Sequence, residues 1–221
     1  EICACLVGSE MCIRDSYYPG GKVMTMKVVF EKATCRLLGA QIIGYEGVDK
    51  RIDVLATAIH AGMKATQLKD LDLAYAPPYS SAKDPVSMAG FMIDNITKEI
   101  LKQWHLEDMD AVLKEEGAVL LDVRTVQEYS RGHISGFINI PLDELREHIH
   151  EIEKGKPVYL ICQSGLRSYI ASRILEGYGY ETYNFSGGFR YYDAVVNDRA
   201  LIERALSLIH ISEPTRHAQI S

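Results

Sequence analysis

The first hundred residues contain two apolar runs interrupted by polar positions, followed by segments of helical period. Residues 22–30 and 35–45 are rich in Val, Ile and Leu with polar residues between them, which favours two strands joined by a turn. Residues 49–63 have apolar side chains at helical spacing and predict a helix, and residues 86–103 predict a second helix. The prolines between these segments exclude a helix interior from residues 73–85. Together these elements predict an α+β unit.

From about residue 103 the pattern changes to short, almost wholly apolar runs that alternate with helical segments. Residues 119–123 and 157–161 are typical of strands buried on both faces of a parallel sheet. Further strands are predicted near Ile138 and at residues 182–185. Helices are predicted at residues 126–130, 142–152, 167–178 and 189–196. Strands alternating with helices indicate an α/β domain with a mostly parallel sheet.

Composition and charge are those of an ordinary globular protein. Of the 221 residues, 47% are hydrophobic and 24% charged, a balance typical of a packed core with a solvated surface. A formal net charge of -6 without a Lys/Arg-rich block argues against a nucleic-acid partner. No apolar run approaches the roughly 20 residues that span a bilayer, and the N-terminus lacks a signal-peptide pattern. We therefore expect a cytoplasmic protein that binds neither nucleic acid nor membrane.

The cysteines point to a reactive thiol rather than a structural one. The spacing of Cys3, Cys5, Cys12, Cys35 and Cys162 forms neither a disulfide framework nor a paired metal motif. We expect no bound metal and a reduced chain, in which an important thiol would be reactive. Cys35, in an apolar predicted strand, is expected to belong to the core.

The two ends of the chain carry strings of foreign appearance. Residues 6–16 (LVGSEMCIRDS) resemble the conceptual translation of a common sequencing-library transposon adapter, and residues 206–216 (LSLIHISEPTR) resemble the same adapter in the opposite orientation. The alternative is a pair of natural tails. We therefore set residues 1–16 and 206–221 aside from the fold prediction and treat the chain as a fragment.

The string Cys162-Gln163-Ser164-Gly165-Leu166-Arg167-Ser168 carries the clearest chemistry. It lies between a predicted buried strand and a helix, where ligands bind in open α/β sheets. Gly165 lets the backbone curl so that N–H groups point at the sulfur, and the helix N-terminus favours an anion there. We expect Cys162 to be largely ionised near neutral pH. Arg167 can brace the loop or face an anionic donor such as thiosulfate.

Two other interpretations of this cysteine are weaker. A free cysteine at a strand end is often only a small buried hydrophobe, but the surrounding glycine, arginine and serine argue against that here. Related phosphatases have a longer loop that makes room for a phosphate. Only four residues separate Cys162 from Arg167, which suits a single sulfur atom.

Short motifs surround the cysteine loop in a recognisable order. They are LDVR at residues 121–124, EY at 128–129, GHISG at 132–136, NIP at 139–141 and GGF at 187–189. In order and spacing they resemble a rhodanese homology domain, which the resemblance places at residues 103–205. It implies that Cys162 carries sulfane sulfur as a persulfide. It also implies that Gln163, Ser164, Gly165, Leu166 and Arg167 form the active-site loop, with Asp122 and Arg124 supporting the architecture beside it.

The first unit has motifs of its own. They are YYPG at residues 17–20, GAQ at 39–41, VDKRID at 48–53 and YAPPYSSAKDP at 75–85. They resemble the C-terminal dimerisation domain of flavin-dependent pyridine nucleotide–disulfide oxidoreductases, in the branch of coenzyme A-disulfide reductases, NADH oxidases and persulfide reductases.

This second resemblance assigns residues 17–102 to the dimerisation domain and implies a homodimer through them. It implies that Tyr75 first, and Tyr17 or Tyr18 second, reach the partner subunit's disulfide site, where a phenol can hydrogen-bond a sulfur. Alternatively, Tyr75 only packs a Pro-rich loop at an interface. Lys50 and Arg51 are expected to be solvated charges at a helix start.

The cofactors follow from resemblance alone. No G-x-G-x-x-G stands between a strand and a helix, so we expect the fragment itself to bind no cofactor. The resemblance implies FAD and NAD(P)H for a full-length enzyme that reduces disulfides or persulfides of coenzyme A-like thiols. Its partner would be a low-molecular-weight thiol, a persulfide or a CoA-type substrate. The alternatives are a rhodanese-like binding or regulatory module without turnover, and the tail of an NADH oxidase of the same family.

Overall fold

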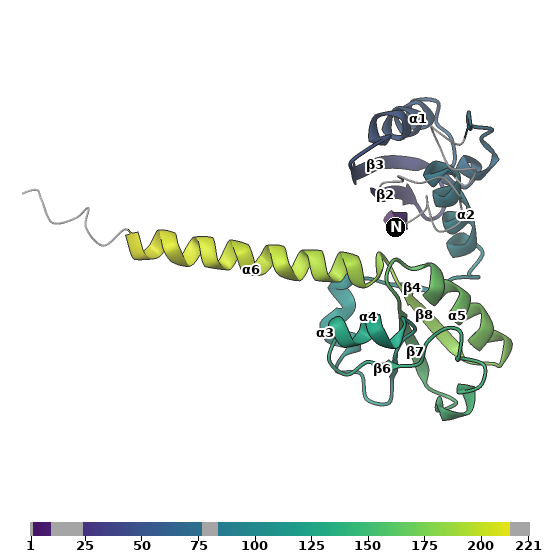
Figure 1. The fold of residues 1–221 in the computed structure, drawn as a ribbon. Coiled ribbons are helices and arrows are strands. Elements are labelled where there is room, and N and C mark those ends of the chain that lie inside the picture. The colour runs from purple at the N-terminus through teal and green to yellow at the C-terminus, as the bar shows by residue number, and fades with distance from the viewer. Residues whose placement is uncertain (1, 10–23, 77–83, 213–221) are drawn as a thin grey trace, which may run out of the picture.

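The computed structural model describes residues 2–9, 24–76 and 84–212, which form two units in chain order (Figure 1). Each unit is built around its own β-sheet, antiparallel in the first and parallel in the second. The predicted α+β unit followed by an α/β domain is confirmed. Among the described residues, no helix is long and apolar enough to cross a membrane.

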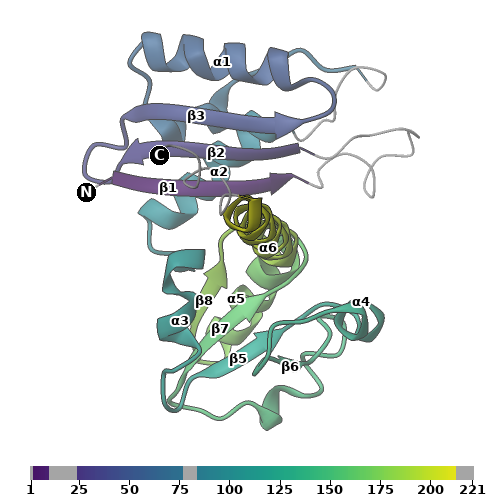
Figure 2. The same cartoon turned by 90° about the vertical axis from the view of Figure 1, so that its left-hand side faces the viewer.

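The first unit contains a three-stranded sheet in the order β1-β2-β3 (Figure 2). Its strands and helices are β1 (Ile2–Ser9), β2 (Met24–Glu31), β3 (Leu37–Gly44), α1 (Val48–His60), the 3-10 helix η1 (Ala65–Asp70) and α2 (Pro85–Thr97). Alternate residues of β2, namely Met26, Val28 and Phe30, are fully buried on one face. Leu55 of α1 and Ile93 of α2 belong to the same core, so the helices cover that face.

The second unit contains a five-stranded sheet in the order β4-β8-β7-β5-β6, in which each recorded pairing is parallel. Its strands are β4 (Gln103–Trp104), β5 (Val119–Asp122), β6 (Ile138–Asn139), β7 (Pro157–Ile161) and β8 (Glu181–Phe185). Its helices are η2 (Leu106–Asp108), α3 (Met109–Val112), α4 (Val126–Arg131), η3 (Ile149–Glu151), α5 (Leu166–Gly177) and α6 (Gly188–Ser212).

The parallel sheet is buried on both faces, as its nearly continuous apolar strands predict. Val158 and Leu160 of β7 pack with Leu175 of α5 on one face. Ile161 packs with Phe185 in an aromatic cluster on the other face. Because side chains alternate along a strand, the next residue after Ile161 returns to the α5 side of the sheet.

Hydrogen bonds join α5 to the end of the first unit. The amide nitrogen of Asn95 donates to the Tyr169 hydroxyl at 3.2 Å, and the guanidinium of Arg173 donates to the Ile100 carbonyl at 2.8 Å. These contacts connect the end of the first unit to the helix that begins at the cysteine loop.

The predicted helix at residues 142–152 is wrong. The segment forms successive turns, in which Glu144, Leu145 and Glu147 donate backbone N–H groups to carbonyls three residues earlier, and it ends in η3. Leu145 is fully buried in the core under α5. The packing of Leu145 into the core therefore outweighs the α-helical propensity of this segment. The segment forms turns with the tighter hydrogen-bond spacing of a 3-10 helix instead.

The predicted helix at residues 86–103 is too long at its end. α2 stops at Thr97, and the Ile100 amide bonds back to the Asn95 carbonyl. Glu99 has a φ of 57°, the left-handed conformation that usually falls to glycine after a helix. Because a glutamate occupies this position, no stop signal was visible in the sequence. Gln103 belongs to a strand instead.

Two side chains of the first unit also differ from expectation. Cys35 precedes β3 at a φ of 59° and is only partly buried, so it is not a core residue of the strand. Arg51 is not a solvated charge but is 5% exposed and forms an ion pair with Asp84 at 3.0 Å. Its partner is 33 residues away in sequence, which the local pattern could not reveal.

Residues 1–16 and 206–221 were set aside from the fold prediction, but parts of both segments form regular structure. Residues 2–9 form β1, which pairs antiparallel with β2. α6 continues to Ser212, far beyond the predicted end at residue 196. The origin of the two adapter-like strings stays a prediction.

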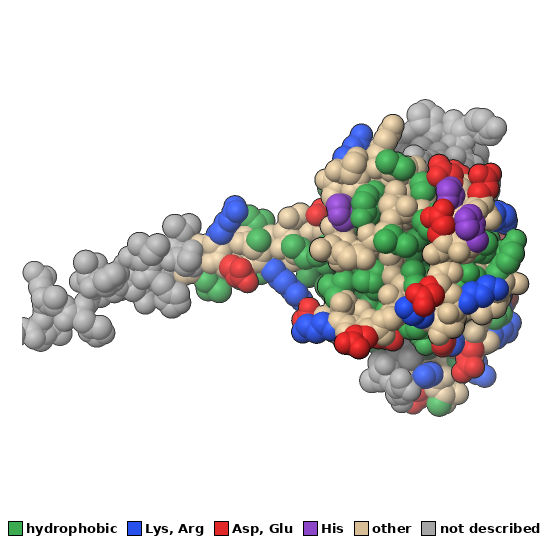
Figure 3. Space-filling view, turned by 90° about the horizontal axis from the view of Figure 1, so that it is seen from below, with side chains coloured by type: hydrophobic (Ala, Val, Ile, Leu, Met, Phe, Trp, Pro, Cys, Tyr) green, Lys and Arg blue, Asp and Glu red, His purple; other side chains and the backbone are tan. Residues whose placement is uncertain are grey.

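α6 is a long helix that projects away from both sheets (Figure 1). Leu201, Ile202 and Leu206 on it are each more than half exposed. Figure 3 shows hydrophobic and charged side chains interspersed along this projecting helix.

Candidate active site

Cys162 sits in a tight loop between β7 and α5. The apolar β7 ends one residue before Cys162, and Gly165, at a φ of 108°, caps the start of α5. That left-handed conformation turns the backbone inward. The Gly165 amide donates to the Cys162 sulfur at 3.1 Å, and the Ser168 hydroxyl lies 3.2 Å from the same atom.

The Cys162 residue is fully buried, and its sulfur faces polar donors. Its neighbours on the other side are apolar residues of the α5 face, including Leu160 and Ala171. Burial alone would penalise a charged sulfur, whereas the amide and hydroxyl donors favour it. The arrangement therefore suits a sulfur that bears negative charge within a largely apolar surrounding.

Ser168 is a site residue that the sequence analysis quoted but did not assign. Its side chain is fully buried, and its hydroxyl lies 3.2 Å from both the Cys162 sulfur and the Gly165 carbonyl oxygen. A hydroxyl has one hydrogen to donate, so the two acceptors compete for it. An ionised sulfur is the stronger acceptor and would draw the hydrogen to itself.

The first residues of α6 hold the loop through two backbone hydrogen bonds. The Phe189 amide donates to the Cys162 carbonyl at 2.8 Å, and the Arg190 amide donates to the Gln163 carbonyl at 3.2 Å. Gly188 makes this close approach possible, since a Cβ there would lie 2.6 Å from the Gln163 carbonyl oxygen. Its φ of 68° independently favours glycine.

Asn184 of β8 supports the loop from a neighbouring strand. Its amide nitrogen donates to the Gly165 carbonyl at 3.1 Å, and the residue is 1% exposed. An asparagine within a predicted strand of the parallel sheet is a signal that could have identified it from the sequence, because a buried amide needs hydrogen-bond partners.

Arg167 pairs with Glu128 of α4, an arrangement that fits the first of the two roles considered for it, bracing the loop. Both terminal nitrogens donate to the carboxylate of Glu128, each at 2.7 Å. Thr125 also donates to this carboxylate through its amide at 2.9 Å and its hydroxyl at 2.8 Å. The hydrogen bonds from Arg167 lower the pKa of Glu128 to about 2, and the same pairing raises the pKa of Arg167.

Asp122 and Arg124 form a second ion pair. The Arg124 guanidinium contacts both carboxylate oxygens of Asp122, with distances of 2.6 to 3.0 Å, and both residues are buried. It also donates to the Gly132 carbonyl at 2.9 Å. The ring of Phe189 stacks on this guanidinium at 3.8 Å. The pair thus connects the end of β5 to the start of α6, which contacts the loop.

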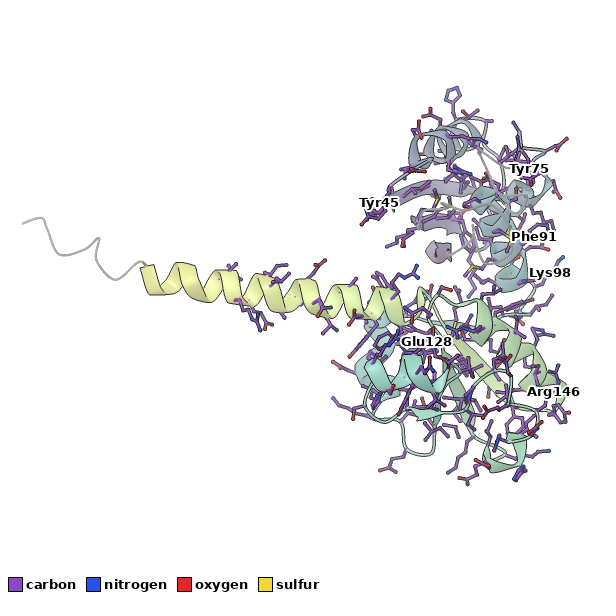
Figure 4. All side chains as sticks on the ribbon, in the orientation of Figure 1. Tyr45, Tyr75, Phe91, Lys98, Glu128 and Arg146 are labelled. Atoms are coloured by element: carbon purple, nitrogen blue, oxygen red, sulfur yellow. The ribbon has the colours of Figure 1, made fainter. Side chains whose placement is uncertain are left out.

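The structure does not bring Tyr75 to the cysteine loop. Figure 4 shows Tyr75 in the first unit and Glu128 in the second. Tyr75 is 54% exposed, and the Ala74 carbonyl beside it accepts a hydrogen bond from Lys50 at 3.0 Å. Tyr17 and Tyr18 lie outside the described residues.

The described strand-to-helix turn after β7 does not fit a dinucleotide. Dinucleotide-binding turns need glycines that let the backbone approach a pyrophosphate. Here the loop closes on the Cys162 sulfur instead, and its helix cap is occupied by that interaction. The described residues also hold no group of three or more His, Cys, Asp or Glu side chains placed for a metal ion.

Two family models match the chain, one in each unit. Residues 105–194 match the rhodanese-like domain, and residues 12–85 match the pyridine nucleotide-disulphide oxidoreductase dimerisation domain. A coenzyme A disulfide reductase from Staphylococcus aureus (strain bovine RF122 / ET3-1) is 41% identical over 76 residues, covering 34% of this chain and 17% of the relative.

Two solved structures are similar across both units. The reduced Bacillus anthracis CoADR-RHD superimposes with a TM-score of 0.81 at 42% identity, covering 90% of this chain and 35% of that one. A NAD-dependent persulfide reductase from A. fulgidus has a TM-score of 0.73 at 39% identity, covering 85% of this chain and 33% of that one. The chain therefore spans about a third of these structures and less of the curated relative.

Proposed function

Since this chain joins the dimerisation domain of the pyridine nucleotide-disulphide oxidoreductases to a rhodanese-like domain, we propose that Cys162 carries sulfane sulfur as a persulfide. The carrier would serve a longer enzyme that reduces disulfides or persulfides of coenzyme A-like thiols. The similarity to proteins named coenzyme A disulfide reductase and persulfide reductase supports this proposal.

The chemistry consists of two half-reactions. In the first, the Cys162 thiolate attacks the outer sulfur of a donor, a new S–S bond forms on Cys162, and the donor's thiolate or sulfite leaves with the electron pair. In the second, an acceptor thiolate attacks the outer sulfur of the persulfide, and Cys162 leaves as a thiolate. Sulfur is transferred with no net oxidation, so this part of the cycle needs no external oxidant.

The observation that carries the proposal is the pair of donors aimed at the sulfur. The Gly165 amide at 3.1 Å and the Ser168 hydroxyl at 3.2 Å would stabilise both the attacking thiolate and the departing thiolate. A cysteine that only filled space in the core would not require these two hydrogen-bond donors.

The first unit would supply dimerisation in this proposal. A homodimer through residues 17–102 would place Tyr75, together with Tyr17 or Tyr18, at the partner subunit's disulfide site. The exposure of Tyr75 is compatible with that role. FAD and NAD(P)H would supply reducing equivalents from domains not encoded by residues 1–221.

Sulfur-transfer kinetics test the proposal. Cys162→Ser should abolish transfer from an organic persulfide to cyanide or to an acceptor thiol, while Cys35→Ser should leave the rate unchanged. Cys35 is the matched control because it is a free cysteine of the other unit. A Cys162→Ser variant that transfers sulfur at the wild-type rate would end the proposal, and so would a wild-type chain with no transfer.

A further inference from the structure

The guanidinium groups of Arg167 and Arg124 near the cysteine loop are each paired with a carboxylate. Arg167 pairs with Glu128 through two hydrogen bonds of 2.7 Å. Arg124 pairs with Asp122 through bonds of 2.6 to 3.0 Å. The formal charge of each pair is zero, so neither pair presents a net positive charge to a sulfur donor.

The loop itself adds no charge that could replace Arg167. Gln163, Ser164 and Leu166 are uncharged, and Leu166 is 56% exposed. Val126, two residues before Glu128, is 61% exposed. The surroundings of the ion pair therefore combine neutral polar groups with exposed aliphatic side chains.

Arg167 is the second residue of α5 and therefore follows the cysteine loop directly. The Cys162 thiolate is among the charges that raise the pKa of Arg167, after the larger effect of Glu128. A guanidinium released from Glu128 would thus be a nearby cation for a charged donor. A dianionic donor must displace the Glu128 carboxylate to gain that cation, whereas a donor bound by apolar contact need not.

We propose that Glu128 determines donor specificity by withholding Arg167 from doubly charged donors, so that Cys162 takes sulfur from organic persulfides in preference to thiosulfate. The inference rests on the proposed function. In both reactions the Cys162 thiolate attacks the outer sulfur of the donor. Sulfite leaves with the electron pair from thiosulfate, and a thiolate leaves with it from the organic persulfide.

The test compares two donors across matched variants. For each variant, kcat/KM is measured with thiosulfate and with the persulfide of 2-mercaptoethanol, and the ratio of the two values is the readout. Glu128→Gln should raise the thiosulfate-to-persulfide ratio roughly tenfold, the effect of one hydrogen bond to a charged group. Glu151→Gln, which removes a carboxylate paired with His148 on the same domain, should leave the ratio unchanged.

Further variants separate specificity from folding. Glu128→Asp keeps a carboxylate but shortens its reach to Arg167, and it should raise the ratio in the same direction by a smaller factor. Glu128→Gln combined with Arg167→Gln should lose the gain, because the released cation is then absent. Rates that fall in parallel for both donors in Glu128→Gln and Glu128→Asp would show a purely structural role and overturn the proposal.

Two other outcomes would overturn it for different reasons. A wild-type chain that uses both donors equally, and loses thiosulfate transfer in Arg190→Gln, would show that Arg190 supplies the donor's cation. A wild-type chain that accepts sulfur from neither donor would refute the proposed function as well. Persulfide transfer in the wild type with an unchanged ratio in Glu128→Gln refutes only the specificity inference.

Discussion

The hydroxyl of Ser168 offers the sharpest test of how the loop activates its cysteine. Ser168→Ala removes one of the two donors on the Cys162 sulfur and leaves the Gly165 amide at 3.1 Å in place. A hydrogen bond to a charged group is worth about 1.5–3 kcal/mol. Sulfur is a weaker hydrogen-bond acceptor than oxygen, so we take the lower value for this contact of 3.2 Å. Since about 1.4 kcal/mol corresponds to a factor of ten, transfer should slow roughly tenfold.

Ser172→Ala is the matched control for this substitution. Ser172 is also fully buried on α5, and its hydroxyl donates to the Tyr169 carbonyl at 2.7 Å without contacting the sulfur. Both variants should lose about 1 kcal/mol of unfolding free energy, because each loses one internal hydrogen bond. The assay is the rate of sulfur transfer from an organic persulfide, measured beside the alkylation rate of Cys162 by iodoacetamide at a fixed pH.

Only Ser168→Ala should slow these two reactions. Equal rates in Ser168→Ala and wild type would refute the donor role of the hydroxyl. An equal loss in Ser168→Ala and Ser172→Ala would show that the effect comes from helix stability alone.

Three further predictions concern the scaffold. Gly188→Ala should lower the unfolding free energy by about 2–4 kcal/mol in urea titrations. Its Cβ would lie 2.6 Å from the Gln163 carbonyl oxygen, and its φ of 68° is strained for alanine. An unchanged urea midpoint would contradict the need for glycine at this contact with the loop. Glu99→Gly should raise stability by roughly 0.5–1 kcal/mol, since it relieves a left-handed glutamate at the end of α2; a loss of stability would contradict that reading. The folded-state pKa of Glu128, about 2, lies below the ordinary value of 4.5, so its pairing with Arg167 stabilises the fold above about pH 4.5 and is lost as the pH falls toward 2. Urea unfolding across this range should show a shallower decline for Glu128→Gln than for wild type, and identical declines would refute the link.

The cysteine loop was accessible to sequence analysis because its determinants are local. A buried strand, a cysteine, a glycine for the left-handed position and a helix follow one another within a few residues, and the structure confirms that order. The participation of Gly165 follows from the same string. Ser168 stood in the string too, but its contact with the sulfur depends on the pitch of the helix and was not anticipated.

The partners of the loop could not be predicted, because they come from distant parts of the chain. Glu128 and Arg167 are 39 residues apart, and the sequence presented Glu128 only as part of the EY motif at residues 128–129. The support from Asn184 likewise depends on β8 lying beside β7 in the sheet. Periodicity identifies elements, but it does not say which side chains of separate elements meet.

The two errors in the helices have separate causes. Residues 142–152 have the composition of a helix, but Leu145 must reach the core under α5, and the segment forms tighter turns to place it there. The end of α2 was missed because Glu99 adopts a conformation that glycine usually signals. For residues 142–152, tertiary contacts thus outweigh a local preference that the sequence displays.

The central claim is that Cys162 holds a transferable sulfur, stabilised by hydrogen bonds from the Gly165 amide and the Ser168 hydroxyl. The most direct measurement is peptide-resolved mass spectrometry after brief exposure of the whole chain to one equivalent of an organic persulfide, followed by alkylation. We expect the peptide containing Cys162 to gain the mass of one sulfur atom, and to lose it again when an acceptor thiol is added before alkylation. Sulfur found on Cys35 instead, or a Cys162 peptide that gains none, would contradict the account.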